Sequence, residues 1–460
     1  MPTTEVEAGV EAGRAPLVRG ASLVRGVPEL RPRWHADVGE YAVDARWSPD
    51  GACVAAACAD GAVVLLDGAT GQVRHRLDAH AGGTLALAWS APEGTRPHGV
   101  LATAGQDGRV RLWDPAAGAP LADLDAAGVD APNGHMPDGH MPNGSTPNGS
   151  TPDGSTPNAA APLRPARRMV PWAEQLAWSP DGRRLATGAG REVRVWDAEG
   201  RLLRRHPPLA STVGALAWRP RPGDAAGPRL SAACYGGVVL YAEPAPNDPA
   251  ESALDDEGRG LVERWFPWKG SFLATAWSPD GRVLAAGMQE SAIHLWVQLS
   301  ARAVNARAAK GEAPVPAPRA AGLPPSVDEA GFDNLEMSGY PTKVRELAWH
   351  PDGRLLATGG GRQVIVWSFA GKGPAGTRPL QLEGHALLVS DVAFSRAGTL
   401  LASGGEDGQL LVWDLVRSSK KPVGGVLLTG AVSRLAWHPH ERLVLGAHAS
   451  GVVAAWEAPR

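Results

Sequence analysis

Hydrophobic and polar residues alternate in short stretches that recur along the chain. One stretch, residues 344–349, reads Val-Arg-Glu-Leu-Ala-Trp, and a run of small apolar residues, 355–359, follows after Pro-Asp-Gly. Alternation with a period of two predicts a half-buried β-strand, and a short apolar run bounded by turn residues predicts a buried one. Proline fixes φ, aspartate bonds to the local backbone and glycine accepts a positive φ, so Pro-Asp-Gly predicts a tight turn between these strands.

A large aromatic residue ends the first strand of each such unit. The string Trp-Ser-Pro-Asp-Gly occurs three times and Trp-His-Pro-Asp-Gly once. In order, the eight first-strand markers, which define units 1 to 8, are Trp47, Trp89, Trp178, Trp218, Trp277, Trp349, Phe394 and Trp437. Four of the intervals are 42, 40, 45 and 43 residues, and the other three, 89, 59 and 72, are lengthened by inserts. A fixed period of this length indicates a repeat architecture rather than several unrelated domains.

A second marker follows in every unit, at the end of the third predicted strand. In order, these residues are Leu66, Trp113, Trp196, Tyr241, Trp296, Trp367, Trp413 and Trp456. Each unit therefore predicts a four-stranded antiparallel sheet with two apolar faces, which neighbouring sheets in a closed ring would bury. We expect an all-β fold, a closed β-propeller of four-stranded antiparallel blades. Eight blades are expected; the alternative is seven, with one degenerate unit outside the ring.

The third strand ends in Trp-Asp at residues 113–114, 196–197 and 413–414, and this repeat resembles the WD40-repeat (WD-repeat) β-propeller family over roughly residues 30–458, without the inserts. The resemblance implies a buried hydrogen-bond relay of His, Ser or Thr, Asp and Trp within a unit. Two units contain all four residues, namely His80, Thr103, Asp107 and Trp113, and His385, Ser403, Asp407 and Trp413. The units ending at Trp196 and Trp367 retain only Thr187 and Thr358. Heavy use of Ala, Gly, Arg and Pro further suggests a bacterial member of the family.

Unit 8 ends at Arg460 without a fourth strand. In the family that the repeat resembles, the ring closes by taking one strand from the other end of the chain. The segment from Leu30 to Asp37, which contains Trp34, is the candidate. We predict that it pairs with the strand that ends at Trp456.

Composition divides the remaining chain into a tail, one domain and three inserts. Residues 1–23 are expected to form a disordered tail, and residues 24–460 the propeller. Flexible inserts are expected at about 128–168, 243–259 and 300–334, the first of which repeats a Pro/Asn/Gly frame of five residues from Pro132. Such tracts cannot bury enough apolar area to offset the entropy of ordering.

Charge and cysteine content narrow the function classes. The net charge is -3 and the sequence pI about 6.5, which gives no bulk attraction to nucleic acid or to an anionic membrane. There is no apolar run of the roughly 18 to 20 residues that a bilayer span needs, and no secretory leader is recognised. Cys53, Cys58 and Cys234 form no CxxC pair, so buried thiols are expected. The expected location is the cytoplasm, without nucleic-acid or membrane partners.

Candidate chemistry is sparse. His135 and His140, each followed by Met, could bind a soft metal, and His438, His440 and His448 form a second histidine group, for which ordinary surface turns are the favoured explanation. Residues 67–71, Asp-Gly-Ala-Thr-Gly, resemble a segment of eight-bladed quinone-dependent dehydrogenases, but only one such segment occurs. No phosphate loop or nucleophile elbow is present. We therefore expect no catalytic activity, no cofactor and no metal.

A binding surface is predicted where equivalent positions of the repeat differ most. The residue six positions before each first-strand marker should lie at the rim of the top face, the face that carries the connections from each fourth strand to the next first strand. These residues are Tyr41, Gly83, Trp172, Thr212, Ser271, Lys343, Leu388 and Ala431. Aromatic and basic side chains anchor interfaces. The candidate partner-binding rim is therefore Tyr41, Trp172 and Lys343, with the neighbouring Trp268 and Tyr340.

These expectations describe a monomeric, non-catalytic platform or scaffold for a protein partner of unknown identity. One alternative is a ligand- or metal-sensing propeller that uses the histidine-containing loops, and a second is a propeller enzyme. For the rim aromatics, packing against adjacent loops is the competing explanation.

Overall fold

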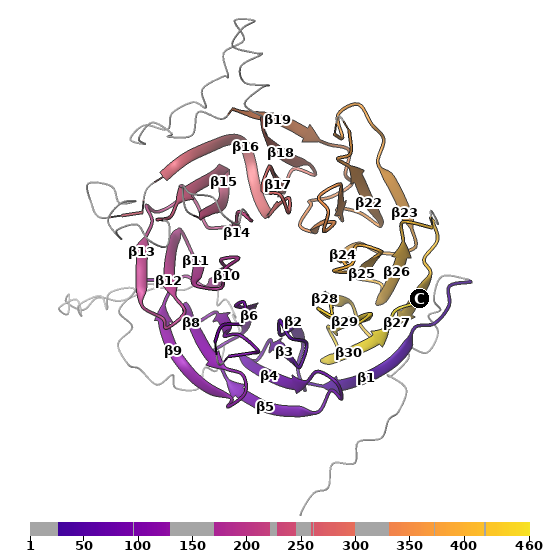
Figure 1. Cartoon of the computed structure of the whole chain (residues 1–460), viewed down its shortest axis with the longest axis horizontal. Coiled ribbons are helices and arrows are strands. Elements are labelled where there is room, and N and C mark those ends of the chain that lie inside the picture. Colours follow the sequence, from indigo (N-terminus) through magenta and orange to yellow (C-terminus); the bar gives the residue numbers. More distant parts are fainter. Residues whose placement is uncertain are drawn as a thin grey trace, which may run out of the picture.

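The computed structural model describes residues 26–94, 96–128, 170–220, 228–244, 259–260, 262–299, 331–371, 373–417 and 420–460. These residues form thirty strands, β1–β30, arranged as a ring of sheets (Figure 1). The all-β closed propeller is confirmed. Among the described residues, no helix is long and apolar enough to cross a membrane.

Units 1, 2 and 3 each form one four-stranded antiparallel sheet, with the strands in sequence order from the inside of the ring outward. Unit 1 contains β2 (Ala42–Trp47), β3 (Cys53–Cys58), β4 (Ala62–Asp67) and β5 (Val73–Asp78). Unit 2 contains β6 (Thr84–Trp89), β7 (Leu101–Gly105), β8 (Arg109–Asp114) and β9 (Ala119–Asp125). Unit 3 contains β10 (Ala173–Trp178), β11 (Arg184–Ala189), β12 (Glu192–Asp197) and β13 (Leu202–Arg205).

Units 4 and 5 share one six-stranded sheet. It contains β14 (Ala215–Trp218), β15 (Arg229–Ala242), β16 (Val262–Trp277), β17 (Val283–Met288), β18 (Ile293–Gln298) and β19 (Phe332–Met337). The strands β15 and β16 are 14 and 16 residues long, and each contains two successive strands of the repeat. The beginning of β15 pairs with β14 and its end with the beginning of β16, while the end of β16 pairs with β17.

Units 6 and 7 return to the simple four-stranded pattern. Unit 6 contains β20 (Leu347–Trp349), β21 (Leu355–Thr358), β22 (Gln363–Ser368) and β23 (Leu380–Glu383). Unit 7 contains β24 (Val389–Phe394), β25 (Leu400–Gly405), β26 (Gln409–Asp414) and β27 (Gly424–Leu427).

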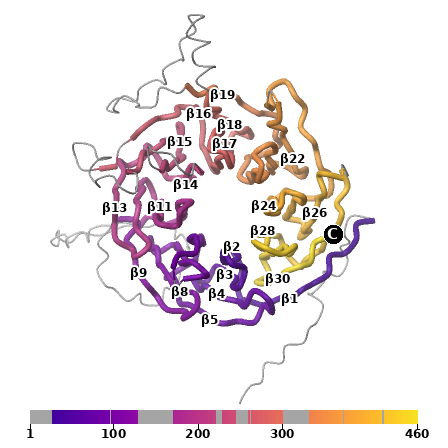
Figure 2. Tube along the Cα trace, in the orientation of Figure 1, coloured from indigo at the N-terminus to yellow at the C-terminus, as the bar shows by residue number. Residues whose placement is uncertain are grey.

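The last sheet joins the two ends of the described chain. It contains β28 (Val432–Trp437), β29 (Leu443–His448), β30 (Val452–Glu457) and, as its outer strand, β1 (Arg31–Asp37). Strand β1 pairs antiparallel with β30, so that Pro32 lies opposite Trp456. Figure 2 shows the indigo β1 running beside the yellow β30. The predicted closure by residues 30–37 is therefore confirmed.

The ring has seven hydrogen-bonded sheets, the number of the alternative expectation, because units 4 and 5 share one sheet. No unit is left outside, however, since every first-strand marker ends a strand of the ring. The inner strands contact one another in the closed order β2, β6, β10, β14, β16, β20, β24, β28 and again β2. The degenerate unit that the alternative required is not found among these strands.

Adjacent units are linked by the first-strand tryptophans. In five of them the indole N–H donates to the backbone carbonyl of the residue before the preceding unit's marker. These bonds run from Trp89 to Arg46, Trp178 to Ala88, Trp218 to Ala177, Trp349 to Ala276 and Trp437 to Ala393, over 2.8–3.3 Å. The repeated tryptophan therefore fixes the distance between neighbouring blades as well as filling the core.

The core lies between the sheets, as separate apolar clusters that follow the ring. One cluster packs Trp34 of β1 and Trp47 of β2 beside residues of β3, β4, β29 and β30. The two indole rings meet edge to face with centroids 6.0 Å apart. Cys53, Cys58 and Cys234 are buried free thiols, as predicted.

Alternation of strand direction places two sets of connections on the same face. The connection before each first strand and the turn between the second and third strands both lie at the top face, and the Pro-Asp-Gly turns lie at the opposite face. The expected tail, residues 1–23, lies outside the described residues, as do almost all of the inserts at 128–168, 243–259 and 300–334.

Candidate functional site

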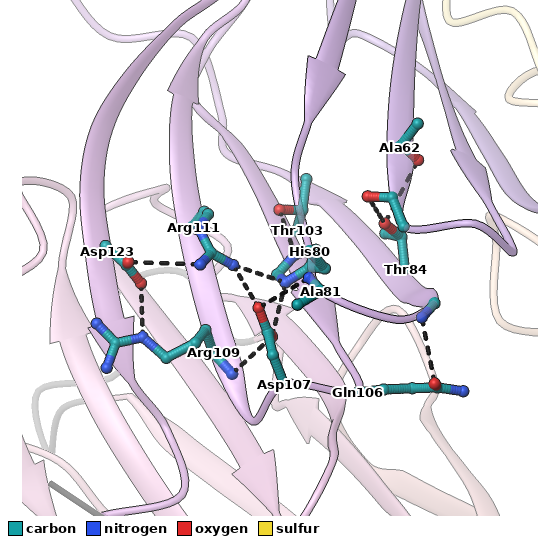
Figure 3. Close-up of polar contacts among 12 residues, drawn as sticks. Ala62, His80, Ala81, Thr84, Thr103, Gln106, Asp107, Arg109, Arg111 and Asp123 are labelled. Carbon is teal, nitrogen blue, oxygen red and sulfur yellow. Dashed lines mark hydrogen bonds and ion pairs between the residues drawn. The ribbon is translucent and has the colours of Figure 1, made fainter. Parts of the chain in front are cut away.

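The relay of unit 2 ties together the two sets of connections at the top face (Figure 3). His80 Nε2 lies 2.9 Å from Thr103 Oγ1, and its Nδ1 lies 2.9 Å from Asp107 Oδ1. Trp113 Nε1 donates to the same Thr103 hydroxyl over 3.0 Å. With the imidazole proton on Nδ1, the Trp113 indole donates to the Thr103 hydroxyl, the hydroxyl donates to His80 Nε2, and His80 Nδ1 donates to the Asp107 carboxylate.

Asp107 also holds the backbone and a second side chain. Its carboxylate accepts the N–H groups of Ala81 and Arg109, and it is 2.8 Å from Nη1 of Arg111. Figure 3 shows Arg111 reaching on toward Asp123 of the outer strand β9. Burial raises the pKa of the Asp107 carboxyl, but hydrogen bonds from His80 and Arg111 outweigh burial and hold it far below its usual range. The Asp107 carboxylate is therefore a permanent negative charge that holds the connection before β6 against the turn between β7 and β8.

Unit 7 repeats this arrangement. His385 Nε2 lies 2.8 Å from Ser403 Oγ, and Nδ1 lies 3.2 Å from Asp407 Oδ1. Trp413 donates to Ser403 over 2.9 Å. Burial raises the pKa of Asp407, but the His385 ring and the backbone N–H of Ala386 lower it to about 2. All eight residues that the resemblance assigned to the relay thus occur in two hydrogen-bonded sets.

Unit 6 has a relay that the sequence did not reveal. Tyr340 takes the position of the histidine: its hydroxyl lies 2.9 Å from Thr358 Oγ1 and accepts the indole N–H of Trp367 over 2.7 Å. Unit 3 retains only the bond from Trp196 to Thr187, over 3.0 Å. Unit 6 lacks the histidine and the aspartate of the pattern, as the sequence indicated, but the Tyr340 hydroxyl bonds to both Thr358 and Trp367.

The predicted rim divides into exposed and packed residues. Tyr41 is 44% and Trp172 47% exposed, and Lys343 is also exposed. Tyr340 is 9% exposed because its hydroxyl lies in the unit 6 relay. Trp268 is half-buried and lies against His294, with ring centroids 3.9 Å apart. Tyr340 and Trp268 therefore have packing partners within the fold, whereas Tyr41 and Trp172 are the more exposed aromatic residues of the predicted rim.

One exposed aromatic at the top face was missed. Tyr235 is 59% exposed and lies at the turn between the second and third strands of unit 4, where units 2 and 7 have the relay aspartate. Its backbone N–H donates to Ser211 Oγ over 2.8 Å. The signal in the sequence was an aromatic residue before Gly-Gly at a turn that elsewhere reads Asp-Gly. We define the top-face aromatics as Tyr41, Trp172 and Tyr235.

The first strands of units 7, 8 and 1 carry a charged cluster. Arg434 Nε lies 3.1 Å from Asp44 Oδ1, and its Nη1 lies 3.8 Å from Asp391 Oδ2. Arg46 holds the other Asp44 oxygen over 3.0 Å. Burial raises the pKa of Asp44, but the two guanidinium groups lower it on balance. This cluster joins β24, β28 and β2 on both sides of the blade that closes the ring.

The histidine group of unit 8 is not one cluster. His438 and His440 lie in the turn after β28, with ring centroids 6.1 Å apart, whereas His448 ends β29 at the other face. His448 is buried beside Trp456, and burial lowers its pKa to about 4. In the described part of the chain, no three His, Cys, Asp or Glu residues lie together as metal ligands would. His135 and His140 lie outside the described residues.

With this geometry established, the class of protein follows: a closed β-propeller of repeated blades with a His-Ser/Thr-Asp-Trp relay at one face. The family model described as "WD domain, G-beta repeat" matches residues 71–114, 174–197, 334–368 and 376–414. A second model, "Anaphase-promoting complex subunit 4 WD40 domain", matches residues 34–92. Segments of the β-propeller therefore match models of WD40 repeats.

Two individual proteins show how far the similarity extends. WD repeat-containing protein 1 of Xenopus tropicalis is 40% identical over 85 residues, which are 18% of this chain and 13% of that protein. The crystal structure of the computationally designed protein Ika8 superposes with a TM-score of 0.61, at 18% identity, and covers 93% of this chain and 100% of its own. The second likeness concerns the fold alone.

Proposed function

We propose that this protein is a non-catalytic platform that binds a protein partner at its top face. The observation that carries the proposal is the exposure of the top-face aromatics: Tyr41, Trp172 and Tyr235 are 44%, 47% and 59% exposed. Large aromatic side chains are enriched at the centres of protein interfaces, and exposed apolar groups that gather on one face are typical of binding surfaces.

The other exposed large apolar residues of the described chain are aliphatic and mostly lie elsewhere. Five are on the outer strands β5, β9, β13 and β23, namely Val73, Leu121, Leu202, Leu203 and Leu380. Scattered aliphatic residues on an outer strand need no functional explanation. Leu387 alone joins the aromatics, since it lies in the connection before β24 at the top face.

The relay hydrogen bonds also favour a binding site at the top face. Asp107 and Asp407 fix the loops that surround the top face to the turns beside them, which keeps the surface ordered before a partner arrives. A surface that is already ordered loses less conformational entropy on binding. The proposal includes a monomeric ring in the cytoplasm that uses no metal or cofactor.

The experiment is affinity capture from the native cell with the intact chain and with Tyr41→Ala/Trp172→Ala/Tyr235→Ala. The matched control is Leu121→Ala/Leu203→Ala/Val416→Ala, which removes exposed apolar side chains away from the top face. We expect one partner to be retained by the wild type and the control and lost by the aromatic variant, with the Tm of all three proteins within a few degrees. Equal retention by the aromatic variant would contradict the proposal.

A further inference from the structure

Unit 6 has a cavity at the top face, and the residues around it differ from those at the same place in units 2 and 7. It has a volume of about 270 Å³ and lies between the loop before β20 and the turn from β21 to β22. Its lining residues are Tyr340, Pro341, Gly359, Gly360, Gly361, Arg362, Gln363 and Ile365. The cavity therefore opens beside the relay tyrosine, at the turn that carries the relay aspartate in the two complete units.

The turn of unit 6 contains no carboxylate. From Thr358 to Trp367 the chain advances nine residues, against ten from Thr103 to Trp113, and the shorter turn reads Gly-Gly-Gly-Arg. Pro341 follows the relay tyrosine, where units 2 and 7 have an alanine whose N–H donates to the relay aspartate. Proline has no N–H. Unit 6 has thus lost both the acid of the relay and the backbone donor that holds it.

Basic side chains replace that acid. Arg362 and Lys343 are exposed, and within the described part of the chain neither forms an ion pair. Thr342, which precedes Lys343, donates its N–H to the Gly360 carbonyl over 3.1 Å, so the loop and the turn that carry the two cations are in contact. Arginine in such a setting is suited to hold a carboxylate through two parallel hydrogen bonds.

Two acids lie near the cavity and do not cancel these charges. Glu383 accepts a hydrogen bond from the side chain of Gln363 over 3.0 Å and is exposed to solvent. Glu346 lies beneath Gly359, with a carboxylate oxygen 2.4 Å from the place a β-carbon would occupy there. Burial raises the pKa of Glu346 to about 7, so part of the population is uncharged at neutral pH. The cavity itself is lined by the basic Arg362 and by no acidic side chain, and Lys343 lies in the loop that borders it.

We propose that this cavity receives an acidic side chain, aspartate or glutamate, from a peptide segment of the protein partner. Its carboxylate binds Arg362 and Lys343, and its methylene groups pack on the Tyr340 ring, Pro341 and Ile365. A cavity of 270 Å³ accommodates one side chain rather than a folded element. The inference rests on the proposed function and adds to it the chemistry that the partner must present.

The test uses a fluorescein-labelled peptide of sequence Glu-Glu-Leu-Glu-Glu-Leu and its counterpart with glutamine in place of each glutamate. Fluorescence anisotropy with the full chain should show the glutamate peptide binding at least about tenfold more tightly, because a charge-assisted hydrogen bond is stronger than a neutral one. The difference should shrink as salt is raised. Equal affinity for the two peptides would overturn the proposal.

The variant Lys343→Ala/Arg362→Ala should lose about tenfold in affinity for the glutamate peptide or more. The matched control is Arg354→Ala, which removes an exposed arginine of the same unit from the Pro-Asp-Gly turn at the opposite face. A second variant, Gly361→Asp, supplies a carboxylate from the chain itself, and it should weaken binding while Gly361→Asn weakens it less. Unchanged affinity in the double variant would overturn the assignment of the site.

Affinity capture separates this inference from the proposed function. Loss of the partner with the aromatic variant but full retention with Lys343→Ala/Arg362→Ala would leave the top-face platform standing and refute the acidic side chain. Retention of the partner by both variants would refute both proposals. Loss of the partner with both variants, together with the peptide preference, would support both.

Discussion

The indole N–H of Trp277 donates to Ser231 Oγ over 3.1 Å, and the same hydroxyl donates to the carbonyl of Ala217 over 2.8 Å. In five other units the first-strand tryptophan reaches the equivalent carbonyl directly. Between units 4 and 5 the serine hydroxyl bridges the gap. The inter-blade link is thus preserved where the two units share one sheet.

Ser231→Ala should destabilise the ring, since it leaves the buried Trp277 N–H and the Ala217 carbonyl without their partner. We expect a loss of about 1–3 kcal/mol in the free energy of unfolding. Urea denaturation measures it, and Ser368→Ala, at an exposed serine, serves as the control and should change stability by about 0.5 kcal/mol or less. Equal effects of the two substitutions would show that the bridge contributes nothing.

Tyr340→Phe tests the relay of unit 6. The substitution keeps the ring but removes the hydroxyl that accepts the Trp367 indole N–H. An unpaired buried donor destabilises by about 1–3 kcal/mol, which thermal unfolding would detect. If Tyr340→Phe left the Tm unchanged, the tyrosine would act through packing alone.

Trp34→Ala tests ring closure. Trp34 is 7% exposed, packs on Trp47 and donates its indole N–H to the Gly68 carbonyl over 2.8 Å. Truncating a buried tryptophan typically lowers stability by about 3–5 kcal/mol. The exposed neighbour Arg33→Ala is the control, and limited proteolysis should cut the Trp34→Ala variant first within β1. Equal resistance of the two variants would argue against a closing role.

Asp407 predicts how the protein responds to acid. Its pKa is lowered from the usual 3.8 to about 2, so its hydrogen bonds contribute stability that is fully present above pH 3.8 and lost as the pH falls through about 2. Asp407→Asn should lower stability at neutral pH and flatten the stability curve in that window. Measuring the Tm between pH 2 and 5 checks the sign, and parallel curves for the two proteins would contradict it.

The buried Glu346 carboxyl should make the stability of the fold decrease as the pH rises, the opposite of the effect of Asp407. Burial raises its pKa from 4.5 to about 7, with a smaller contribution from Asp391. The folded state therefore binds the proton more tightly than the unfolded state, and stability falls as the pH rises from about 4.5 toward 7. Glu346→Gln should remove this decline and raise stability above pH 7. The measurement is urea denaturation at pH 5 and pH 8, and an equal decline in both proteins would exclude Glu346 as its source.

The sequence predicted the fold because its strongest signals are repeated. The two markers of each unit recur in all eight units, and apolar and polar residues alternate around them as they do in β-strands. Sheets with two apolar faces are then best buried in a closed ring. The single sheet of units 4 and 5 could not be foreseen, since it depends on the pairing of Tyr235 in β15 with Ser271 in β16. The turn predicted at Gly236-Gly237 does occur within β15, because the N–H of Glu243, just after this strand, donates to the carbonyl of Pro228, just before it.

The candidate site was predicted less well, because exposure depends on neighbours that lie far away in sequence. Trp172 and Trp268 look alike as aromatic residues near a first strand, but only Trp268 finds a ring, His294, against which to pack. Tyr340 looked like a rim residue because its role requires knowing that its hydroxyl reaches Thr358. Tyr235 was overlooked because the turn that carries it departs from the repeat.

The pairing of β1 with β30 also bears on synthesis of the chain. The outer strand of the last blade is made first, and its partner is complete only when Glu457 has been added. Until then β1 awaits its pairing strand and one apolar face of unit 1 awaits the packing of the last blade, and unpaired strands and exposed apolar faces favour misassembly. A ribosome paused late in translation would therefore hold an open arc rather than a ring, and we expect chaperone dependence to be greatest in that interval.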